Sequence, residues 1–398
     1  MPMFRELFIS IYLFVFKLIF NFFNLIPLQN KTVFIVSFKN NLDTTINLLD
    51  ELIDNHNIII LDSNNVFQKS SNYTVLNFKP HNIIDFLTSI YHLATARHII
   101  IDNYYAFLSV TNFKTEVKCT QLWHAVGAMK LFGLNDMSNG SRSEKAIKRF
   151  KAVYDRFDSV VVGSRKMEQI FKASFGIEDE TRFLRTGIPR TDFFFNDVAK
   201  QKAMQQFKDD FPLAADRKVI LYAPTYREDQ LNDTSISLQM NLDKMYKQLK
   251  SNYILLLRLH PALNNHFINK YPGFVFNVSE YESINTLLVG SDILITDYSS
   301  IPFEFALLNK PMIFYTYDLD TYGATRGLPD NYMESVPGPI AYDTDDIIQL
   351  IKQEQFDLEK VKHFANEWNE YSQGNSTQNL IESLYAIPKE TEQIREHV

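Results

Sequence analysis

Short apolar runs alternate with amphipathic stretches along most of the chain, and this alternation constrains the fold more than any other feature. In the first half, the apolar runs have the length and composition of buried strands, and segments of helical period separate them. The strand-like runs are 32–38, 57–61, 98–102, 120–124 and 159–164, and the helical segments include 42–54, 82–96 and 142–157. This pattern predicts a doubly wound parallel sheet.

The pattern restarts after a polar, proline-containing stretch, DDFPLAADRK at 209–218, which suits a linker. A second set of strand-like runs follows at 219–225, 253–261, 274–279, 292–300 and 312–317. A chain of 398 residues has room for two domains. We therefore predict an α/β protein with two Rossmann-like domains facing a cleft, the GT-B arrangement. Their boundaries are placed at 31–208 and 209–388, with a polar tail at 389–398.

Charge and cysteine content exclude several classes of protein. The net charge of −7 argues against a nucleic-acid partner, because such proteins carry a clustered basic surface. Cys119 is the single cysteine, which excludes an internal disulfide and a cysteine-based metal cluster. The sequence contains neither the G-x-G-x-x-G dinucleotide fingerprint nor the P-loop motif.

The N-terminal segment is the most apolar part of the chain, LFISIYLFVFKLIFNFFNLIPL at 7–28. No small-residue cleavage site follows it, which argues against a cleaved signal peptide. Its strongly polar residues fall on one helical stripe: Glu6, Ser10, Lys17, Asn21 and Asn24. We therefore predict that residues 1–30 form an amphipathic helix lying in the membrane interface. A single membrane span and a buried core helix are the alternatives.

Polar residues cluster where the predicted strands of the second half end, and ligands bind beyond such ends in parallel sheets. Arg258 and His260 end one strand and suit a phosphate, or are a surface arginine and a histidine that caps a turn. Ser299 and Ser300 stand at a strand-to-helix turn that could bind an anion, or could be only a helix cap. Further candidates at these ends are Thr225, Tyr226, Arg227, Asp297 and Glu304, the last suited to a ribose.

Other motifs carry less definite signals. The stretch RTGIPRTDFF at 185–194 supplies Gly187, Pro189, Arg190 and Asp192 near the predicted hinge. Asp318 and Asp320 form a D-x-D, and Asp343, Asp345 and Asp346 form a cluster. We interpret both acidic groups as solvated loop residues, and no metal site is predicted.

The stretch LWHAVGAMKLFGL at 122–134 raises a choice about His124. A packed core imidazole is one interpretation, and a base carried by a strand end to the mouth of a cleft is the other. Asp102 ends the neighbouring strand and could orient the imidazole.

Taken together, these stretches resemble the CDP-glycerol glycerophosphotransferase family, which builds wall teichoic acid in Gram-positive bacteria. The matching signatures run in order from residue 123 to 339: Trp123-His124, TGIPRTD at 186–192, YAPTYR at 222–227, RLHP at 258–261, TDYSS at 296–300 followed by Glu304, and PGP at 337–339. Before residue 120 only the strand–helix pattern is similar.

The resemblance implies a peripheral enzyme at the cytoplasmic face of the cell membrane, without a cofactor. Such an enzyme transfers glycerol phosphate from CDP-glycerol to a polyprenyl-diphosphate-linked acceptor and releases CMP. His124 and Asp102 would be catalytic. The residues implied for CDP-glycerol binding are Thr225, Arg227, Arg258, His260, Asp297, Ser299, Ser300 and Glu304.

One departure bears on the branch of the family. Many polymerases read Trp-His-Gly-Thr-Pro, whereas this chain reads Trp-His-Ala-Val-Gly-Ala at 123–128. This motif and the chain length resemble those of the primase branch, whose members add the first glycerol phosphate to a lipid-linked ManNAc–GlcNAc disaccharide. A later-acting glycerol- or ribitol-phosphate transferase and a non-catalytic membrane-bound scaffold are the alternatives.

Overall fold

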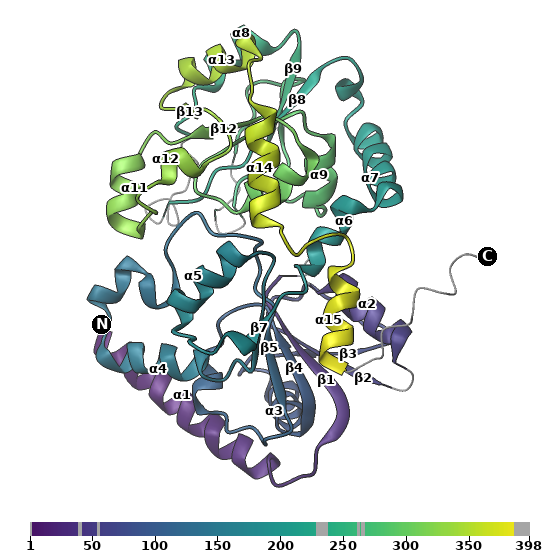
Figure 1. Ribbon diagram of the computed structural model, residues 1–398, viewed down its shortest axis with the longest axis vertical. Helices are drawn as coiled ribbons and strands as arrows, with labels where there is room; N and C mark the ends of the chain where they lie inside the picture. The colour runs from purple at the N-terminus through teal and green to yellow at the C-terminus, as the bar shows by residue number, and fades with distance from the viewer. Residues whose placement is uncertain are drawn as a thin grey trace, which may run out of the picture. The chain divides into compact units, whose positions relative to one another are not determined.

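The computed structural model describes residues 2–38, 42–53, 56–227, 238–260, 263 and 267–385 (Figure 1). The contacts divide the chain into two compact units. The first unit comprises the described residues of 1–125, 132–192 and 370–398, and the second comprises those of 126–131 and 193–369.

The first unit is built on a parallel sheet of seven strands in the order β3-β2-β1-β4-β5-β6-β7. The strands are β1 Gln29–Val36, β2 Asn57–Asp62, β3 Thr74–Asn77, β4 Ala96–Ile101, β5 Lys118–Gln121, β6 Ser159–Val161 and β7 Phe183–Leu184. The helices are α1 Pro2–Phe23, α2 Asp43–Leu52, α3 Ile83–Thr95, α4 Glu144–Tyr154, α5 Arg165–Phe175 and α15 Ser376–Tyr385. The five strands predicted for this half are confirmed.

The second unit repeats the plan with six parallel strands in the order β10-β9-β8-β11-β12-β13. The strands are β8 Lys218–Tyr222, β9 Tyr253–Leu257, β10 Val275–Asn277, β11 Ile293–Thr296, β12 Met312–Tyr315 and β13 Ile340–Ala341. The helices are α7 Asp197–Asp210, α8 Leu242–Leu249, α9 Ile284–Gly290, α10 Ile301–Phe305, α11 Leu319–Arg326, α12 Tyr332–Ser335, α13 Thr344–Gln353 and α14 Leu358–Trp368, and the short α6 Asp192–Phe195 stands at the boundary between the units.

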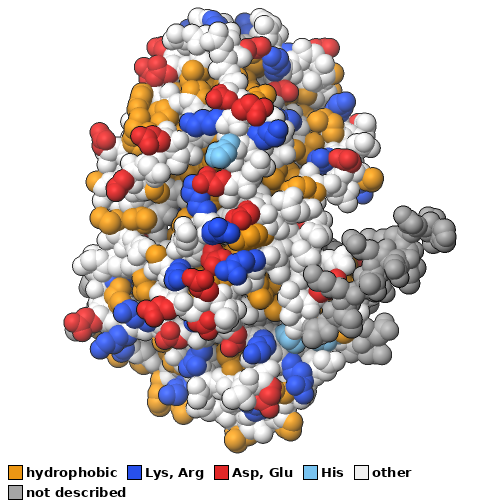
Figure 2. All heavy atoms as spheres, viewed as in Figure 1, with side chains coloured by type: hydrophobic (Ala, Val, Ile, Leu, Met, Phe, Trp, Pro, Cys, Tyr) orange, Lys and Arg blue, Asp and Glu red, His pale blue; other side chains and the backbone are white. Residues whose placement is uncertain are grey.

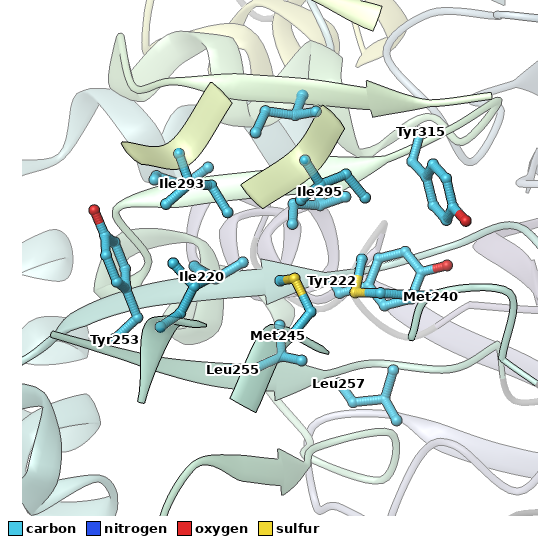
Figure 3. Packing of buried hydrophobic residues seen from close by; sticks show 14 of the residues in the cluster. Ile220, Tyr222, Met240, Met245, Tyr253, Leu255, Leu257, Ile293, Ile295 and Tyr315 are labelled. Atoms are coloured by element: carbon cyan, nitrogen blue, oxygen red, sulfur yellow. The ribbon is translucent and has the colours of Figure 1, made fainter. Parts of the chain in front are cut away.

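The core of the second unit follows the two-residue period of its strands. Tyr253, Leu255 and Leu257 of β9 point to one face of the sheet, as do Ile293 and Ile295 of β11 (Figure 3). All are buried, and helices α8 and α13 add residues such as Met245 and Ile347 to the same cluster. These layers fix the sheet whose strand ends carry the candidate ligand-binding residues.

The division of the chain differs from the one predicted at residue 208. Residues 193–208 belong to the second unit, because α7 packs closely on α9. The closeness is seen at Gly290, where an added Cβ would lie 2.2 Å from Cγ of Phe207. The described residues after Asn369 return to the first unit, and 126–131 lie in the second. The expected polar tail at 389–398 lies outside the described residues.

Helix α1 has one face on the first unit and another exposed. Leu13, Phe16 and Phe20 are buried, and Phe16 stacks on Phe107 with ring centroids 4.9 Å apart. The exposed face carries large apolar side chains, including Phe4, Leu7, Phe8, Ile11, Phe14, Val15, Leu18 and Phe22. Among the described residues, α1 is the one helix long and apolar enough to cross a membrane, with mean hydropathy 1.8 over Phe4–Phe23.

The polar stripe predicted on α1 is divided between protein and solvent. Glu6 pairs with Arg149 at 3.1 Å, and Ser10 accepts a hydrogen bond from Lys145 at 2.7 Å. Lys17 and Asn21 are exposed. Glu6 and Ser10 therefore attach the helix to the first unit, and they lie at one edge of its exposed apolar face.

On the face of the protein that Figure 2 shows, apolar and charged side chains are mixed, and the charged ones are of both signs. This distribution agrees with the modest net charge of −7.

Candidate active site

Three neighbouring strands of the first sheet bring their carboxyl ends to one edge. β1, β4 and β5 are adjacent and parallel, and they lead to Ser37, Asp102 and His124 respectively. The structure thus brings the two predicted catalytic residues together.

Asp102 supports the loop after β1 with its carboxylate. The carboxylate is buried and accepts hydrogen bonds from the backbone N–H groups of Ser37 and Phe38, at 2.9–3.0 Å, and from the hydroxyl of Tyr105 at 2.8 Å. Burial raises the pKa of Asp102 to about 6, against the lowering effect of these hydrogen bonds. The carboxylate is occupied by these donors, so Asp102 is positioned to act on His124 through its main chain.

The main-chain carbonyl of Asp102 lies 3.0 Å from Nδ1 of His124. A carbonyl oxygen can only accept a hydrogen bond, so Nδ1 carries the proton and Nε2 of the neutral ring is the acceptor nitrogen. The ring stacks on Trp123 at 4.4 Å and lies 5.1 Å from the ring of Phe38. The half-buried imidazole is therefore fixed in both tautomer and plane.

The residue before His124 has an unusual backbone. Trp123 has φ of 63°, in the left-handed region that bulky residues rarely occupy. Its N–H donates to Oε1 of Gln121 at 2.8 Å, and its ring packs on Phe132, Phe171 and Phe175. Such strain costs about 1–3 kcal/mol, persists only where the surroundings impose it, and clusters at functional sites.

The second sheet has a comparable edge. β9, β8 and β11 are adjacent and parallel, so residues 223–227, 258–260 and 297–300 follow at the same end of the sheet. The candidate CDP-glycerol residues named from the sequence come together at this edge, with Glu304 following in α10.

Arg227 is enclosed by acidic and aromatic side chains. Its guanidinium pairs with Asp318 at 2.7 Å and with Asp297 at 3.1 Å, and it lies over the rings of Tyr298 and Tyr322. Burial alone would lower the pKa of Arg227, but the two carboxylates raise it above its ordinary value. The arrangement fixes the 223–227 loop to the ends of β11 and β12.

The ion pairs of Arg227 change the interpretation of Asp318 and show what Asp297 contacts. Asp318 is a partly buried ion-pair partner, so its interpretation as a solvated loop acid was wrong. The sequence held a signal for this role, because Asp318 closely follows the end of a predicted strand, as the other candidate residues do. Asp297 is buried and also accepts from the backbone N–H of Thr225 at 2.8 Å. Burial raises the pKa of Asp297, and Arg227 opposes that rise.

Arg258 and His260 follow β9 but have different surroundings. Arg258 donates to the carbonyls of Val278 and Tyr281 at 3.0 and 2.9 Å, holding the loop after β10. The His260 side chain is exposed, and its ring lies 4.5 Å from that of Tyr226. Burial of part of the ring and the nearby charge of Lys130 lower the pKa of His260.

The strand-to-helix turn after β11 is present, but its helix is short. α10 spans only Ile301–Phe305, so its dipole contributes less than a long helix would. Oγ of Ser299 lies 2.9 Å from Oγ1 of Thr296, and Ser300 is half-buried. Glu304 is buried with 4% of its surface exposed.

The acidic cluster at 343–346 is a helix cap, in which Asp343 and Asp346 form a capping box on α13.

The segment after His124 crosses into the second unit. Residues 126–131 pack there, and the N–H of Leu131 donates to the carbonyl of Gly327 at 3.1 Å. Gly127 is required by close approach, since an added Cβ would lie 2.5 Å from Cε1 of Phe303.

Comparisons with known proteins decide the family. The model of the CDP-Glycerol:Poly(glycerophosphate) glycerophosphotransferase family matches residues 18–386. The chain belongs to this family. The resemblance drawn from residues 123–339 is thereby confirmed, as is the assignment of the chain as a glycerophosphotransferase enzyme.

Named relatives within the family include primases and polymerases. The chain is 38% identical over 381 residues to a teichoic acid glycerol-phosphate primase of Bacillus subtilis (strain 168), covering 95% of this chain and 97% of that protein. It is 32% identical over 320 residues to a teichoic acid poly(ribitol-phosphate) polymerase of Bacillus spizizenii, covering 80% of this chain and 51% of that protein.

Solved structures support the same family and the GT-B-like fold. The wall teichoic acid polymerase TagF matches with a TM-score of 0.80 and 26% identity, covering 97% of this chain and 96% of that one. A histidine-to-asparagine variant of TagF, soaked with CDPG, matches with a TM-score of 0.80 and 25% identity. The predicted α/β fold class is confirmed.

Proposed function

We propose that this glycerophosphotransferase is a primase of wall teichoic acid synthesis. It transfers glycerol phosphate from CDP-glycerol to a polyprenyl-diphosphate-linked ManNAc–GlcNAc disaccharide and releases CMP. The extent of the similarity supports this choice, because the chain covers 97% of the glycerol-phosphate primase but only 51% of the polymerase.

The observation that carries the proposed mechanism is the tautomer of His124. With its Nδ1 proton donated to the carbonyl of Asp102, the imidazole presents Nε2 as a proton acceptor. The acceptor hydroxyl has a high pKa, so a base that takes its proton during attack accelerates the reaction. His124 Nε2 would receive that proton as the hydroxyl oxygen bonds to the β-phosphorus. The bond from that phosphorus to the bridging oxygen then breaks, and CMP departs.

CDP-glycerol would bind at the carboxyl edge of the second sheet. The CDPG-soaked structure of the related TagF supports a CDP-glycerol ligand for this fold. His260, Ser299 and Ser300 would contact the diphosphate, because they are exposed or half-buried at that edge. The remaining proposed contacts are Thr225, Arg227, Arg258, Asp297 and Glu304. Of these, Arg227, Arg258 and Asp297 also hold the loops that form the edge.

The enzyme would work as a peripheral protein on the cytoplasmic face of the cell membrane. Support comes from α1, whose outward face carries a row of exposed phenylalanine, leucine and isoleucine side chains. With its other face packed on the first unit, this helix suits an in-plane anchor better than a span. A polyprenyl-linked acceptor is held at the same membrane surface.

A product assay tests the proposed function. The full-length protein is incubated with synthetic lipid-linked disaccharide and either CDP-glycerol or CDP-ribitol, and CMP and lipid products are measured. We expect CMP only with CDP-glycerol and a product that gains one glycerol phosphate. A ladder of additions in the mass spectrum would assign a polymerase, and activity with CDP-ribitol would assign a ribitol-phosphate transferase. No CMP with either donor would leave the scaffold alternative.

Substitution of the two histidines tests the mechanism. His124→Ala is expected to bind CDP-glycerol as the parent does and to lose roughly 10²–10⁴-fold in kcat, the usual contribution of a positioned base. His260→Ala is expected to weaken CDP-glycerol binding. Titration calorimetry and thermal melts on both variants separate these effects. An unstable His124→Ala variant that keeps most of its activity would instead indicate a packed core imidazole.

A further inference from the structure

Arg190 contacts the main chain of the proposed base. Its Nη1 donates a hydrogen bond to the carbonyl oxygen of His124 at 2.9 Å, within the first unit. His124 is thus restrained at its carbonyl by Arg190 and at its ring by the carbonyl of Asp102. Trp123, with its strained backbone, directly precedes His124. The contacts with Arg190 and Asp102 therefore hold His124 in place against relaxation of that strain.

The segment that carries Arg190 is itself held by the C-terminal part of the chain. The carboxylate of Asp192 accepts hydrogen bonds from the N–H groups of Ser376 and Thr377, both at 2.8 Å, at the start of α15. The N–H of Ile188 donates to Oγ of Ser372 at 3.0 Å. Residues 186–192, which the sequence marked as a motif near the predicted hinge and as one of the family signatures, form an attachment site for residues 370–385.

Gly187 shows how close this attachment is. Its φ is 80°, and an added Cβ would lie 2.4 Å from Oγ of Ser376 and 2.5 Å from the carbonyl oxygen of Tyr371. Only glycine combines that backbone conformation with this approach. The C-terminal segment therefore fixes the backbone on the N-terminal side of Arg190, and Asp192 fixes it on the other.

We propose that Arg190 is a positioning residue for His124, held in place by the C-terminal segment at residues 370–385. Arg190 would act on the reaction by fixing the direction of the His124 imidazole rather than by touching the substrate. This inference rests on the proposed function, in which His124 is the base. A shift of about 1 Å in a reacting group can reduce the rate by about 10²-fold, so loss of one anchoring contact has a measurable effect.

A double-substitution experiment tests this role. In the full-length enzyme, Arg190→Ala is expected to lower kcat by about 10–100-fold, with KM and the Kd for CDP-glycerol within about twofold of the parent. Arg190→Lys, which keeps a cationic donor, should recover part of kcat. In the His124→Ala background, Arg190→Ala should cause no further loss, because a residue that acts only through His124 has nothing left to orient.

Arg185→Ala is the matched control. Arg185 lies five positions earlier in the same stretch and is half-exposed, and its guanidinium pairs with Glu168 at 2.7 Å. Its removal deletes an arginine and an ion pair without touching His124. We expect kcat within about twofold of the parent.

Three results would overturn the inference. Additive losses in the double variant would place Arg190 in direct contact with substrate or in general stability. A raised Kd for CDP-glycerol would make Arg190 a ligand-binding residue. Unchanged kcat in Arg190→Ala would remove it from catalysis. Failure of the proposed function is seen separately, as absence of CMP release by the parent or as full activity of His124→Ala.

The role of the C-terminal segment has its own pair of variants. Gly187→Ala should displace residues 371–376 and lower kcat in the same way, while Gly273→Ala should not. Gly273 has a similar φ of 75°, but beyond its chain neighbours no atom of the described residues lies within 4 Å of an added Cβ, so it reports backbone strain alone. Equal kcat in the two variants would show that the attachment at Gly187 does not act on His124.

Discussion

Among single residues, a partly buried histidine of the first unit, His98, contributes to how the protein responds to acid. The ring of His98 lies against Tyr385 with centroids 4.3 Å apart, and its buried Nδ1 has no hydrogen-bond partner among the described residues. Burial, together with smaller contributions from the nearby His56, Arg97 and Lys118, lowers the pKa of His98 to about 4. The native state therefore resists protonation of this ring.

The sign of the pH effect follows from this pKa. The folded value of about 4 lies below the unfolded value of about 6.5, so the stabilisation is complete above pH 6.5 and is lost as the pH falls toward 4. After allowance for partial exposure, we expect the parent to lose about 1 kcal/mol more than His98→Gln between pH 7 and pH 5. Urea unfolding at the two pH values measures this difference, with the exposed His363→Gln as control. Equal losses in parent and His98→Gln would contradict the prediction.

The candidate site residues that directly follow a predicted strand could be identified from the sequence. His124, Arg258 and Asp297 were found because a strand leads to each of them. What those side chains contact was not predictable, because hydrogen-bond partners depend on loops that meet only in the folded chain. Asp102 approaches His124 with its carbonyl rather than its carboxylate, and Arg227 pairs with Asp318, 91 positions away. The roles of the site residues as ligands and base stay predictions.

At the scale of elements, the two faces of α1 should have separable functions. The outward residues Phe8, Ile11 and Val15 are 71%, 52% and 45% exposed, whereas Phe16 is fully buried. Replacing the three outward residues with glutamine removes apolar area available to a membrane, so binding to lipid vesicles should weaken by at least about tenfold. Thermal stability should be unchanged. Vesicle sedimentation and thermal melts of the full-length variants test both statements.

Phe16→Ala provides the opposite substitution on the same helix. Removing a buried aromatic side chain costs about 3–5 kcal/mol, so the melting temperature should fall while the folded protein keeps its affinity for vesicles. Undiminished sedimentation of the outward triple variant would show that another surface binds the membrane.

The strength of the periodic signal explains which elements the sequence predicted. Buried strands such as β1, β4, β9 and β11 have continuous apolar runs, and all were anticipated. The sheet-edge strands β3, β7 and β13 were missed, since they have four, two and two residues and cannot show a period. Such short strands exist because a neighbouring strand is already in place to pair with them.

At the scale of the whole molecule, sequence order and spatial membership differ. The chain passes between the units four times, after residues 125, 131, 192 and 369. Composition marked only the polar stretch at 209–218, which lies inside the second unit. Close packing rather than linker-like composition marks the chain near two of these passages: Gly127 packs against Phe303, and the C-terminal segment packs against Gly187.

The passage at residues 126–131 gives a prediction that sequence order alone would not suggest. Gly127 is three residues from His124, yet Gly127→Ala should damage the second unit, because the new methyl group would overlap the ring of Phe303. Overpacking of this kind costs about 1–3 kcal/mol, and hydrogen exchange should increase around α10. Phe303→Leu in the same chain should restore part of the stability by making room. Gly140→Ala is the control from the same half of the sequence, because in the described part of the chain no atom beyond its chain neighbours lies within 4 Å of the added Cβ. If the Phe303 substitution fails to rescue, or if exchange increases around β5 instead, the segment does not belong to the second unit in solution.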